Sequence, residues 1–478
     1  MILNVRLYIK MKPLYILFGL LILCSCQTIG PNNSVVFFGG DIINPTNDYV
    51  ILYDTENTID TLYLNTENRF SHYFSDFKPG IHSFVHGGKH QSILLESNDS
   101  IMMHLNTLDF DESIVYNGIG AKKNNYLINL LLKLEQEDSQ TNSLYSQPPT
   151  TYHQNIETLI SKNIEDLETF LKNNPNSERF KKIAISSIKY HYYTRKELFP
   201  YRHFGKNYLN SFKKLPANFY DFRTDIVYND TDLKDFYLYY NFLFPHINNL
   251  ALEQLIKTKA HFNVEDHKLN YTMQKLQLID SLVTNTLIKN NLLKYTTRNF
   301  ISNSNSIDES YILYQTFLEK STNSKDKIYI KNLFKNAQGL QSGYPLPAIE
   351  VINNQNNTLN INTIIDKTTV IYFWDNANRY HFENSHFKVK SLQNAFPKID
   401  FIAINVNSMH TNVWKNMLYG NQFKINTEYR FADPSYAKKR LAINYIKKVL
   451  IVDKQGFILN ATADLFDPNF ETLLKKYN

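Results

Sequence analysis

The stretch Val370-Ile371-Tyr372-Phe373-Trp374 decides how the last third of the chain is interpreted. An unbroken run of β-branched and aromatic residues indicates a strand that is buried on both faces, as in a sheet covered by helices on each side. The segments that follow alternate in type: a helix is predicted over 379–396, a strand over 399–406, a helix over 412–418 and a strand over 449–452. This alternation predicts an α/β domain.

The first third of the mature chain has a different pattern. From 35 to about 116, short β-rich runs alternate with turn signals, which predicts a β-sandwich domain over 34–118. The turn signals are Asn44-Pro45, Lys78-Pro79-Gly80, Gly87-Gly88 and Ser97-Asn98-Asp99. His86-Gly87-Gly88 is similar to the oxyanion-hole turn of some esterases, but the chain has no Gly-x-Ser-x-Gly nucleophile motif, so a plain hairpin turn is predicted there.

The middle of the chain, 120–335, is predicted to be an all-α domain of about eight helices. One amphipathic face is formed by apolar residues three and four positions apart, namely Ile156, Leu159, Ile160, Ile164, Leu167 and Leu171. Further helices are predicted over 180–193, 233–255 and 269–288. The polar, glycine-containing segment 336–343 is the predicted connector to the last domain, 343–478.

The last domain resembles the thioredoxin-like domain of the TlpA/ResA family. Pro347 stands where that family has its opening proline, 370–374 resembles the strand that leads to the active site, and 448–456 is similar to the late strand and turn. The family's reactive Cys-x-x-Cys pair lies four and seven residues after the tryptophan, positions that fall here on Asn378 and His381.

The resemblance therefore implies a redox site that has lost its chemistry. The vestigial active-site positions are Trp374, Asn378, His381 and Lys447, which aligns with the family's cis-proline. Asparagine is a favourable helix N-cap, so Asn378 is predicted to have a structural role. A non-proline cis peptide costs about 2.5–4 kcal/mol, so the Ile446–Lys447 bond is predicted to be trans.

The first third resembles the small β-sandwich module at the N-terminus of many envelope lipoproteins of the same class. The features that match are Gly39-Gly40, Asn68-Arg69-Phe70, Leu95-Glu96 before Asp99-Ser100-Ile101, and Gly118-Ile119-Gly120-Ala121 followed by Asn124 or Asn125. The complete expectation is a multidomain chain with an N-terminal β-sandwich, a central all-α domain and a C-terminal α/β thioredoxin-like domain.

The N-terminus carries the only two cysteines, Cys24 and Cys26. They follow the ten-residue apolar run 14–23, which suits the core of a signal peptide and is too short for a permanent membrane span. Leu23-Cys24-Ser25-Cys26 resembles a bacterial lipobox, which implies a signal peptide over 1–25 and lipid attachment at Cys26. The alternative is an ordinary secretion signal with accidental cysteines. Translation could start at Met1 or Met11.

Charge and composition exclude several classes of function. The formal charge of +6 falls to +3 once Arg6, Lys10 and Lys12 leave with the signal peptide, and no basic stripe suggests nucleic-acid binding. His381 and His386, five residues apart, lie about 140° apart around a helix and do not share a face for a metal. His386 is predicted to be a satisfied, half-buried histidine and His381 to be a candidate to line the vestigial cleft. No catalytic residue, metal site or cofactor is predicted.

The leading hypothesis is a cell-envelope lipoprotein, held at the membrane by its lipid and facing the periplasm. Its thioredoxin-like domain would act as a binding or scaffolding module for envelope proteins or peptides, without thiol chemistry. The alternative is an enzyme that uses carboxylate or histidine chemistry in the helical domain or an interdomain cleft. A third hypothesis is a domain that presents the cysteines of a partner protein.

Overall fold

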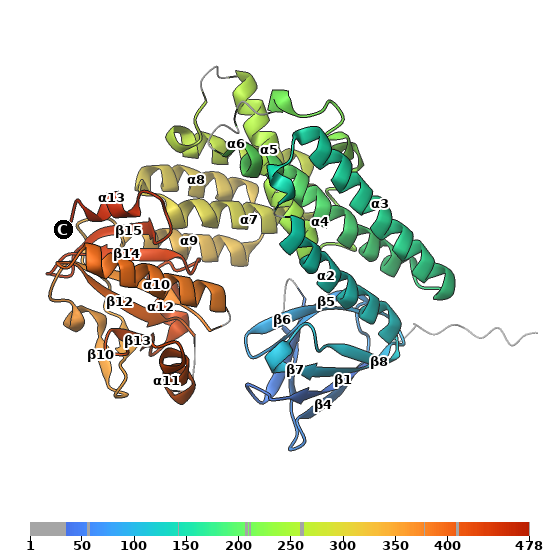
Figure 1. Cartoon of the computed structure of the whole chain (residues 1–478), viewed down its shortest axis with the longest axis horizontal. Coiled ribbons are helices and arrows are strands. Elements are labelled where there is room, and N and C mark those ends of the chain that lie inside the picture. Colours follow the sequence, from blue (N-terminus) through green and yellow to red (C-terminus); the bar gives the residue numbers. More distant parts are fainter. Residues whose placement is uncertain are drawn as a thin grey trace, which may run out of the picture.

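The computed structural model describes residues 35–477, except 55–57, 142, 206–208, 210–211, 259–261, 377 and 408–410. The predicted signal peptide and both cysteines lie outside the described residues. Figure 1 shows an N-terminal unit of β-sheets in blue, a central helical unit in green and yellow, and a C-terminal α/β unit in orange and red. The predicted multidomain architecture is confirmed.

The N-terminal unit is a sandwich of two four-stranded sheets. One sheet has the order β4 (Arg69–Phe74), β1 (Val36–Ile43), β7 (Ser100–Asn106), β8 (Val115–Ile119), and the other has the order β3 (Thr58–Tyr63), β2 (Tyr49–Tyr53), β5 (Gly80–His86), β6 (Lys89–Leu95). Inward-facing side chains from both sheets, among them Phe38, Leu52 and Phe84, form one apolar core. The alternation along the predicted strands reflects this single buried face.

Gly87 and Gly88 form the turn between β5 and β6, as predicted. Both have positive φ angles, 60° and 82°, which a two-residue hairpin loop requires and glycine adopts without steric cost. His86 is buried next to this turn. Its Nε2 accepts the N–H of Thr46 and its Nδ1 lies 2.9 Å from the carbonyl oxygen of Tyr49. This histidine holds two loops together and is fully satisfied.

The central unit contains eight α-helices within the described residues. They are α2 (Ala121–Thr141), α3 (Pro149–Asn173), α4 (Glu178–Phe204), α5 (Tyr237–Thr258), α6 (Lys268–Leu282), α7 (Thr286–Asn303), α8 (Ile307–Lys320) and α9 (Ser324–Gln338). The amphipathic face predicted around Ile156, Ile160 and Leu167 is the buried face of α3. Burial of such stripes against one another is what stabilises helices of this length.

Two expected boundaries in this unit were wrong. The single helix predicted over 269–288 is broken, because Asn285 caps α7 by accepting the N–H of Ile288, and Asn229 accepts the N–H groups of Thr284 and Asn285 at 2.7 Å each. Asn229 lies more than fifty residues earlier, so no local pattern reveals the break. The connector predicted over 336–343 begins later, because α9 continues to Gln338.

The C-terminal unit is a seven-stranded mixed sheet with helices on both faces, which confirms the predicted α/β domain. The strand order is β10 (Thr358–Asn360), β9 (Glu350–Ile352), β13 (Glu428–Phe431), β12 (Asp400–Asn405), β11 (Thr369–Trp374), β14 (Lys448–Val452), β15 (Ile458–Asp464). β11 and β12 are parallel, whereas β14 is antiparallel to both β11 and β15. The helices are α10 (Arg379–Ala395), α11 (Thr411–Gly420), α12 (Pro434–Arg440) and α13 (Phe470–Leu474).

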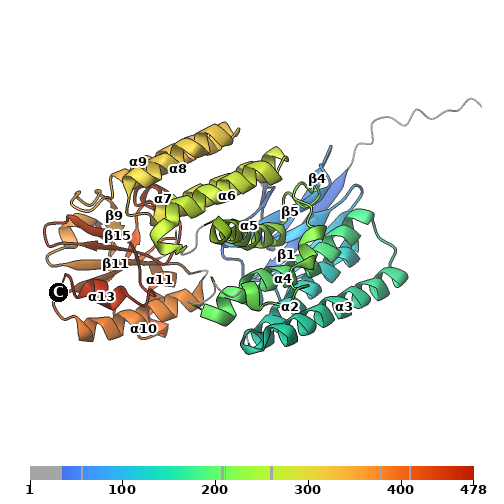
Figure 2. The same ribbon diagram turned by 90° about the horizontal axis from the view of Figure 1, so that it is seen from above.

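The two faces of this sheet belong to different hydrophobic cores. On one face Tyr372 and Trp374 pack with apolar residues of α10, α11 and α13. On the other face Ile371 and Phe373 belong to a core that continues without a break into the helical unit. Figure 2 shows this arrangement, with α10 and α13 on one side of the sheet and α7 and α9 towards the other.

Polar contacts reinforce the junction between the helical unit and the sheet. Asn444 accepts a hydrogen bond from Tyr329 of α9 and donates one to Ser302 of α7. Asn336, in the last turn of α9, donates to the carbonyl oxygen of Lys439 in α12 at 2.9 Å. The C-terminal unit is therefore joined to the helical unit by apolar packing and by side-chain hydrogen bonds.

Candidate functional site

The junction between β11 and α10 carries the predicted vestigial site. Trp374 ends β11 and is completely buried. Asp375 accepts the backbone N–H of Asn378 at 2.8 Å, and Asn378 accepts the backbone N–H of His381 at 2.9 Å. Asn378 is thus the N-cap of α10, as predicted. Its side chain occupies the position where a cysteine would need the free amides and the positive end of the helix dipole.

His381 is buried beneath this N-cap. Neither ring nitrogen has a hydrogen-bond partner among the described residues, and the ring packs edge-on against Phe466 at a centroid distance of 5.8 Å. Burial lowers the pKa of His381; the carboxylates of Asp375 and Asp464 oppose this shift, and the ammonium of Lys447 adds to it. The imidazole is therefore held neutral, and no described residue donates a hydrogen bond to it or accepts one from it.

Lys447 lies at the same end of the sheet as His381 and its side chain is exposed. The Ile446–Lys447 peptide bond is trans, as predicted, like the other peptide bonds of the described residues. The structure therefore brings together all four vestigial positions. Trp374 lies in the core below, Asn378 caps α10, His381 lies in the first turn of that helix, and Lys447 lies beside them.

A buried carboxyl group that the sequence did not point to lies behind this site. Glu428 accepts the indole N–H of Trp374 at 3.1 Å, and its other oxygen lies 3.0 Å from Nε2 of His386. Burial raises the pKa of Glu428, although the bonds from His386 and Trp374 act in the opposite direction. Because its partners are 54 and 42 residues away in the sequence, no local signal identifies Glu428.

The hydrogen bonds determine which atoms of His386 and Glu428 carry protons. Nδ1 of His386 lies 2.7 Å from the carbonyl oxygen of Phe382, which can only accept, so Nδ1 carries a proton. Nε2 then either accepts from a protonated Glu428 or donates to an ionised one, and the pair shares one proton. Both ring nitrogens of His386 are hydrogen-bonded, as predicted, but the residue is buried, whereas the sequence predicted a half-buried histidine.

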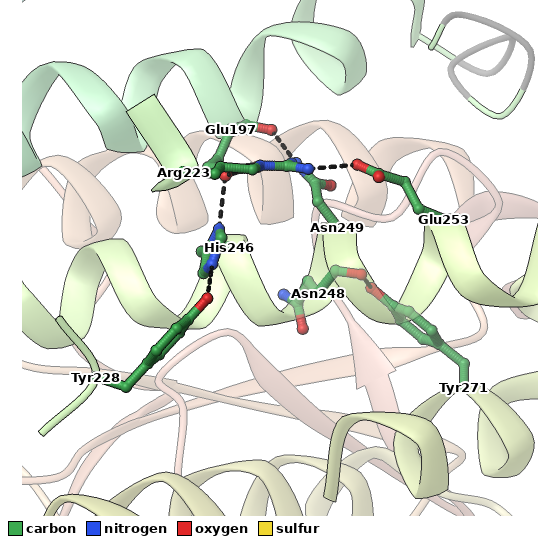
Figure 3. A network of polar contacts seen from close by, with 8 residues as sticks. All are labelled: Glu197, Arg223, Tyr228, His246, Asn248, Asn249, Glu253 and Tyr271. Carbon is green, nitrogen blue, oxygen red and sulfur yellow. Dashed lines mark hydrogen bonds and ion pairs between the residues drawn. The ribbon is translucent and has the colours of Figure 1, made fainter. Parts of the chain in front are cut away.

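The helical unit contains a second group of buried ionisable residues (Figure 3). Glu197 of α4 accepts from the guanidinium of Arg223 at 2.8 and 2.6 Å, and Arg223 also donates to Glu253 at 2.7 Å. Nδ1 of His246 lies 2.7 Å from Glu197, and its Nε2 lies 2.7 Å from the hydroxyl of Tyr228. Burial alone would raise the pKa of Glu197, but Arg223 and His246 hold it below its ordinary value.

This network joins α4 and α5 to the short 3₁₀ helix Asp221–Asp225. Each ring nitrogen of His246 and each oxygen of Glu197 is hydrogen-bonded, and neither residue lines a described cavity. A buried ion pair with satisfied partners fixes geometry, and it offers no free base or acid to a substrate. The network therefore gives no support to the alternative of carboxylate or histidine catalysis.

A cavity of about 910 Å³ lies on the other side of α5, between α5, α6 and α7. Asn248 and Tyr271, drawn in Figure 3, lie between the network and the cavity, where the hydroxyl of Tyr271 donates to the carbonyl of Asn248 at 3.1 Å. Among the lining residues that the structure describes, the charged ones are Lys268, Lys275 and Glu309, and none is a histidine.

The described part of the chain contains neither a helix suited to a membrane span nor a cluster of metal-ligating side chains. None of its helices combines the length and the apolar character that a membrane span requires. Within the same residues, histidine, aspartate and glutamate side chains do not gather in a group of three or more that could ligate a metal ion.

No protein-family model matches the chain, and no curated protein matches its sequence. Solved structures are similar to part of it. The thioredoxin domain of a thiol-disulfide oxidoreductase from Bacteroides vulgatus is 20% identical over 29% of this chain and 99% of that one, with a TM-score of 0.25. A thiol:disulfide interchange protein from a Bacteroides species is 18% identical over 29% of this chain and 92% of that one, with a TM-score of 0.26.

A thioredoxin-like protein from Bacteroides caccae is 11% identical over 45% of this chain and 85% of that one, with a TM-score of 0.29. The fold assignment rests on the topology. The order β13-β12-β11-β14-β15, with β11 and β12 parallel and β14 and β15 antiparallel, defines a thioredoxin-like domain in this chain. Within the described residues this domain contains no cysteine pair.

Proposed function

We propose that this chain is a cell-envelope lipoprotein, attached to the membrane through Cys26 and facing the periplasm, whose thioredoxin-like domain has no redox activity. The domain acts as a binding or scaffolding module that packs rigidly against the helical unit. Envelope proteins or peptides are the expected partners. The proposal rests on the residues that occupy the redox positions and on how the domain is packed.

The observation that carries the proposal is the core shared between the sheet and the helical unit. Ile371, Phe373 and Leu450 from the sheet belong to the same buried cluster as Ile330 and Leu333 of α9. Separate domains that move relative to one another usually meet through smaller and more polar interfaces. A shared apolar core favours a function in which the thioredoxin-like domain and the helical unit form one rigid body.

The redox positions support the same conclusion. Asn378 uses the N-terminus of α10 for a cap, and His381 beneath it is neutral and enclosed. Thiol exchange requires a thiolate that attacks a disulfide, and no side chain at these positions can form one. Trp374 is fully buried and is not part of the exposed surface at these positions.

Lipid attachment is tested by labelling the full chain in cells with radioactive palmitate. We expect the wild type and the matched control Cys24→Ala to incorporate the label and to be recovered in the membrane fraction. Cys26→Ala should lose both. Equal labelling of the Cys26→Ala chain, or loss of label in Cys24→Ala alone, would refute the anchor.

The lack of redox activity is tested by reduction of insulin in the presence of dithiothreitol. We expect the purified protein to add nothing to the rate given by dithiothreitol alone, because the described residues hold no cysteine. Catalysed turnover by the wild type that is lost in a Cys24→Ala/Cys26→Ala double variant would contradict the proposal, because it would show cysteine-dependent exchange.

A further inference from the structure

The cavity in the helical unit contains a lysine that has no counter-ion among the described residues. Lys275 of α6 lines the cavity, and its ammonium lies 4.5 Å from the ring centroid of Tyr271. No described carboxylate forms an ion pair with it, and burial alone lowers its pKa to about 8. A half-buried charge that is not compensated within the protein costs free energy, and an anionic ligand would remove this cost.

Other features of the wall add to the positive potential at this place. The N-terminus of α8 opens on the cavity through Ser304, Ser306 and Glu309, and Ser306 caps that helix. The positive end of a helix dipole favours an anion nearby, and the carboxylates of Asp308 and Glu309 in the first turn offset part of this effect. Lys268 also lines the cavity, so that two cations and one carboxylate, Glu309, are its charged groups among the described residues.

The cavity also has one side-chain acceptor without a partner among the described residues and one backbone carbonyl that lacks its usual helical donor. The side-chain oxygen of Asn299 is buried and accepts no hydrogen bond from the described residues. Pro245 lies inside α5 and has no N–H group, so the carbonyl of Asn241, four residues earlier, lacks its helical donor. Asn241 and Pro245 both line the cavity. These acceptors suit a ligand that carries an N–H or O–H group.

The rest of the wall is largely aromatic. Phe244 and Tyr295 stack with their ring centroids 3.8 Å apart, and Tyr271 and Phe300 lie in the same wall. Flat apolar surface of this kind binds the ring or chain of an organic ligand. A bare inorganic anion would leave this surface and the free acceptors unused.

We propose that the helical unit binds a small organic anion, with its acidic group at Lys275, its apolar body against Tyr271, Phe244 and Tyr295, and a donor group directed to Asn299. This site is separate from the vestigial redox site and from the lipid anchor. It gives the chain a ligand-binding function that the scaffold alone does not have.

The test uses two fluorescent probes that differ in charge. 8-Anilinonaphthalene-1-sulfonate carries an anion, an N–H donor and an aromatic body, and N-phenyl-1-naphthylamine has the same body and donor without the anion. Both are titrated into the full chain carrying Cys26→Ala, which cannot carry the lipid. We expect saturable one-to-one binding of the anionic probe.

In this chain Lys275→Met should weaken the anionic probe at least about tenfold, because a charge-assisted bond is lost, and leave the neutral probe within twofold. Lys275→Arg retains the charge, and Lys331→Met removes an exposed lysine on α9; both should bind as the parent does. Far-UV circular dichroism verifies that each variant is folded.

The proposal is overturned if the parent shows no saturable binding of the anionic probe, or if Lys275→Met changes its affinity less than twofold or weakens both probes equally. When the anionic probe binds as expected, benzoate and phenyl phosphate are added as competitors. The one that displaces the probe shows whether the site prefers a carboxylate or a phosphate. Neutral benzamide should not compete. Palmitate labelling and the insulin assay do not depend on these outcomes.

Discussion

Replacing Glu428 by glutamine should leave the thioredoxin-like domain almost as stable as before. Glutamine has the same shape, its amide oxygen can accept the indole N–H of Trp374, and its amide nitrogen can donate to Nε2 of His386. The neutral tautomer of His386 with the proton on Nδ1 is already fixed by Phe382. All three groups remain paired, so we expect Glu428→Gln to cost less than about 1 kcal/mol.

Glu428→Ala should be far more costly. It leaves the indole N–H and Nε2 of His386 without partners in a dry core and opens a cavity beside Trp374, a combination that typically costs about 3–5 kcal/mol. Urea denaturation followed by tryptophan fluorescence measures both variants. If Glu428→Gln is destabilised as much as Glu428→Ala, a neutral side chain at this position does not satisfy Trp374 and His386, and the hydrogen-bond arrangement given above is wrong.

The effect of pH has a definite sign. Burial raises the pKa of Glu428 above 4.5, so the unfolded chain loses this proton before the folded chain does. The stability of the wild type should therefore fall as pH rises through 4.5 towards the folded pKa, relative to Glu428→Gln, which has no such proton. Between pH 4 and pH 7 we expect the free energy of unfolding of Glu428→Gln to rise relative to that of the wild type. If the difference between the two free energies stays constant, the pKa of Glu428 is not raised.

Two further predictions concern the same domain. Asn378→Ala should cost about 1 kcal/mol in the urea experiment because α10 loses its cap, whereas Asn378→Asp should retain most of the stability; equal losses would exclude the cap as the cause. Lys448 is buried, donates to the carbonyls of Leu441 and Ala442, and has its pKa lowered by burial to about 7. Between pH 7 and 10.5 the folded chain releases this proton first, so the wild type should gain stability relative to Lys448→Met, and parallel pH profiles would contradict this.

Much of the fold follows from local patterns in the sequence. The buried run at 370–374 and the alternation of strands and helices after it predict the mixed sheet, and Gly87-Gly88 predicts its hairpin turn. Asn378 was identified as a helix cap because capping depends on residues only three positions apart. Features of this kind need no knowledge of tertiary contacts.

The functional features that were missed depend on long-range contacts. Glu428 looks like an ordinary charged residue until Trp374 and His386 meet it across the sheet. Lys275 is one of many lysines in the chain, and its isolation appears only when α5, α6 and α7 enclose the cavity. The break before α7 depends on Asn229, which lies in a distant loop. Such signals are set by packing and not by spacing.

Coupled unfolding tests the central claim most directly. Both tryptophans, Trp374 and Trp414, lie buried in the thioredoxin-like domain, so their fluorescence reports this domain alone, whereas far-UV circular dichroism reports mainly α2–α9. Because the two units share one core, we predict that both signals change in one coincident urea transition. Two separate midpoints would show that the units unfold independently, and the scaffold account would then be wrong.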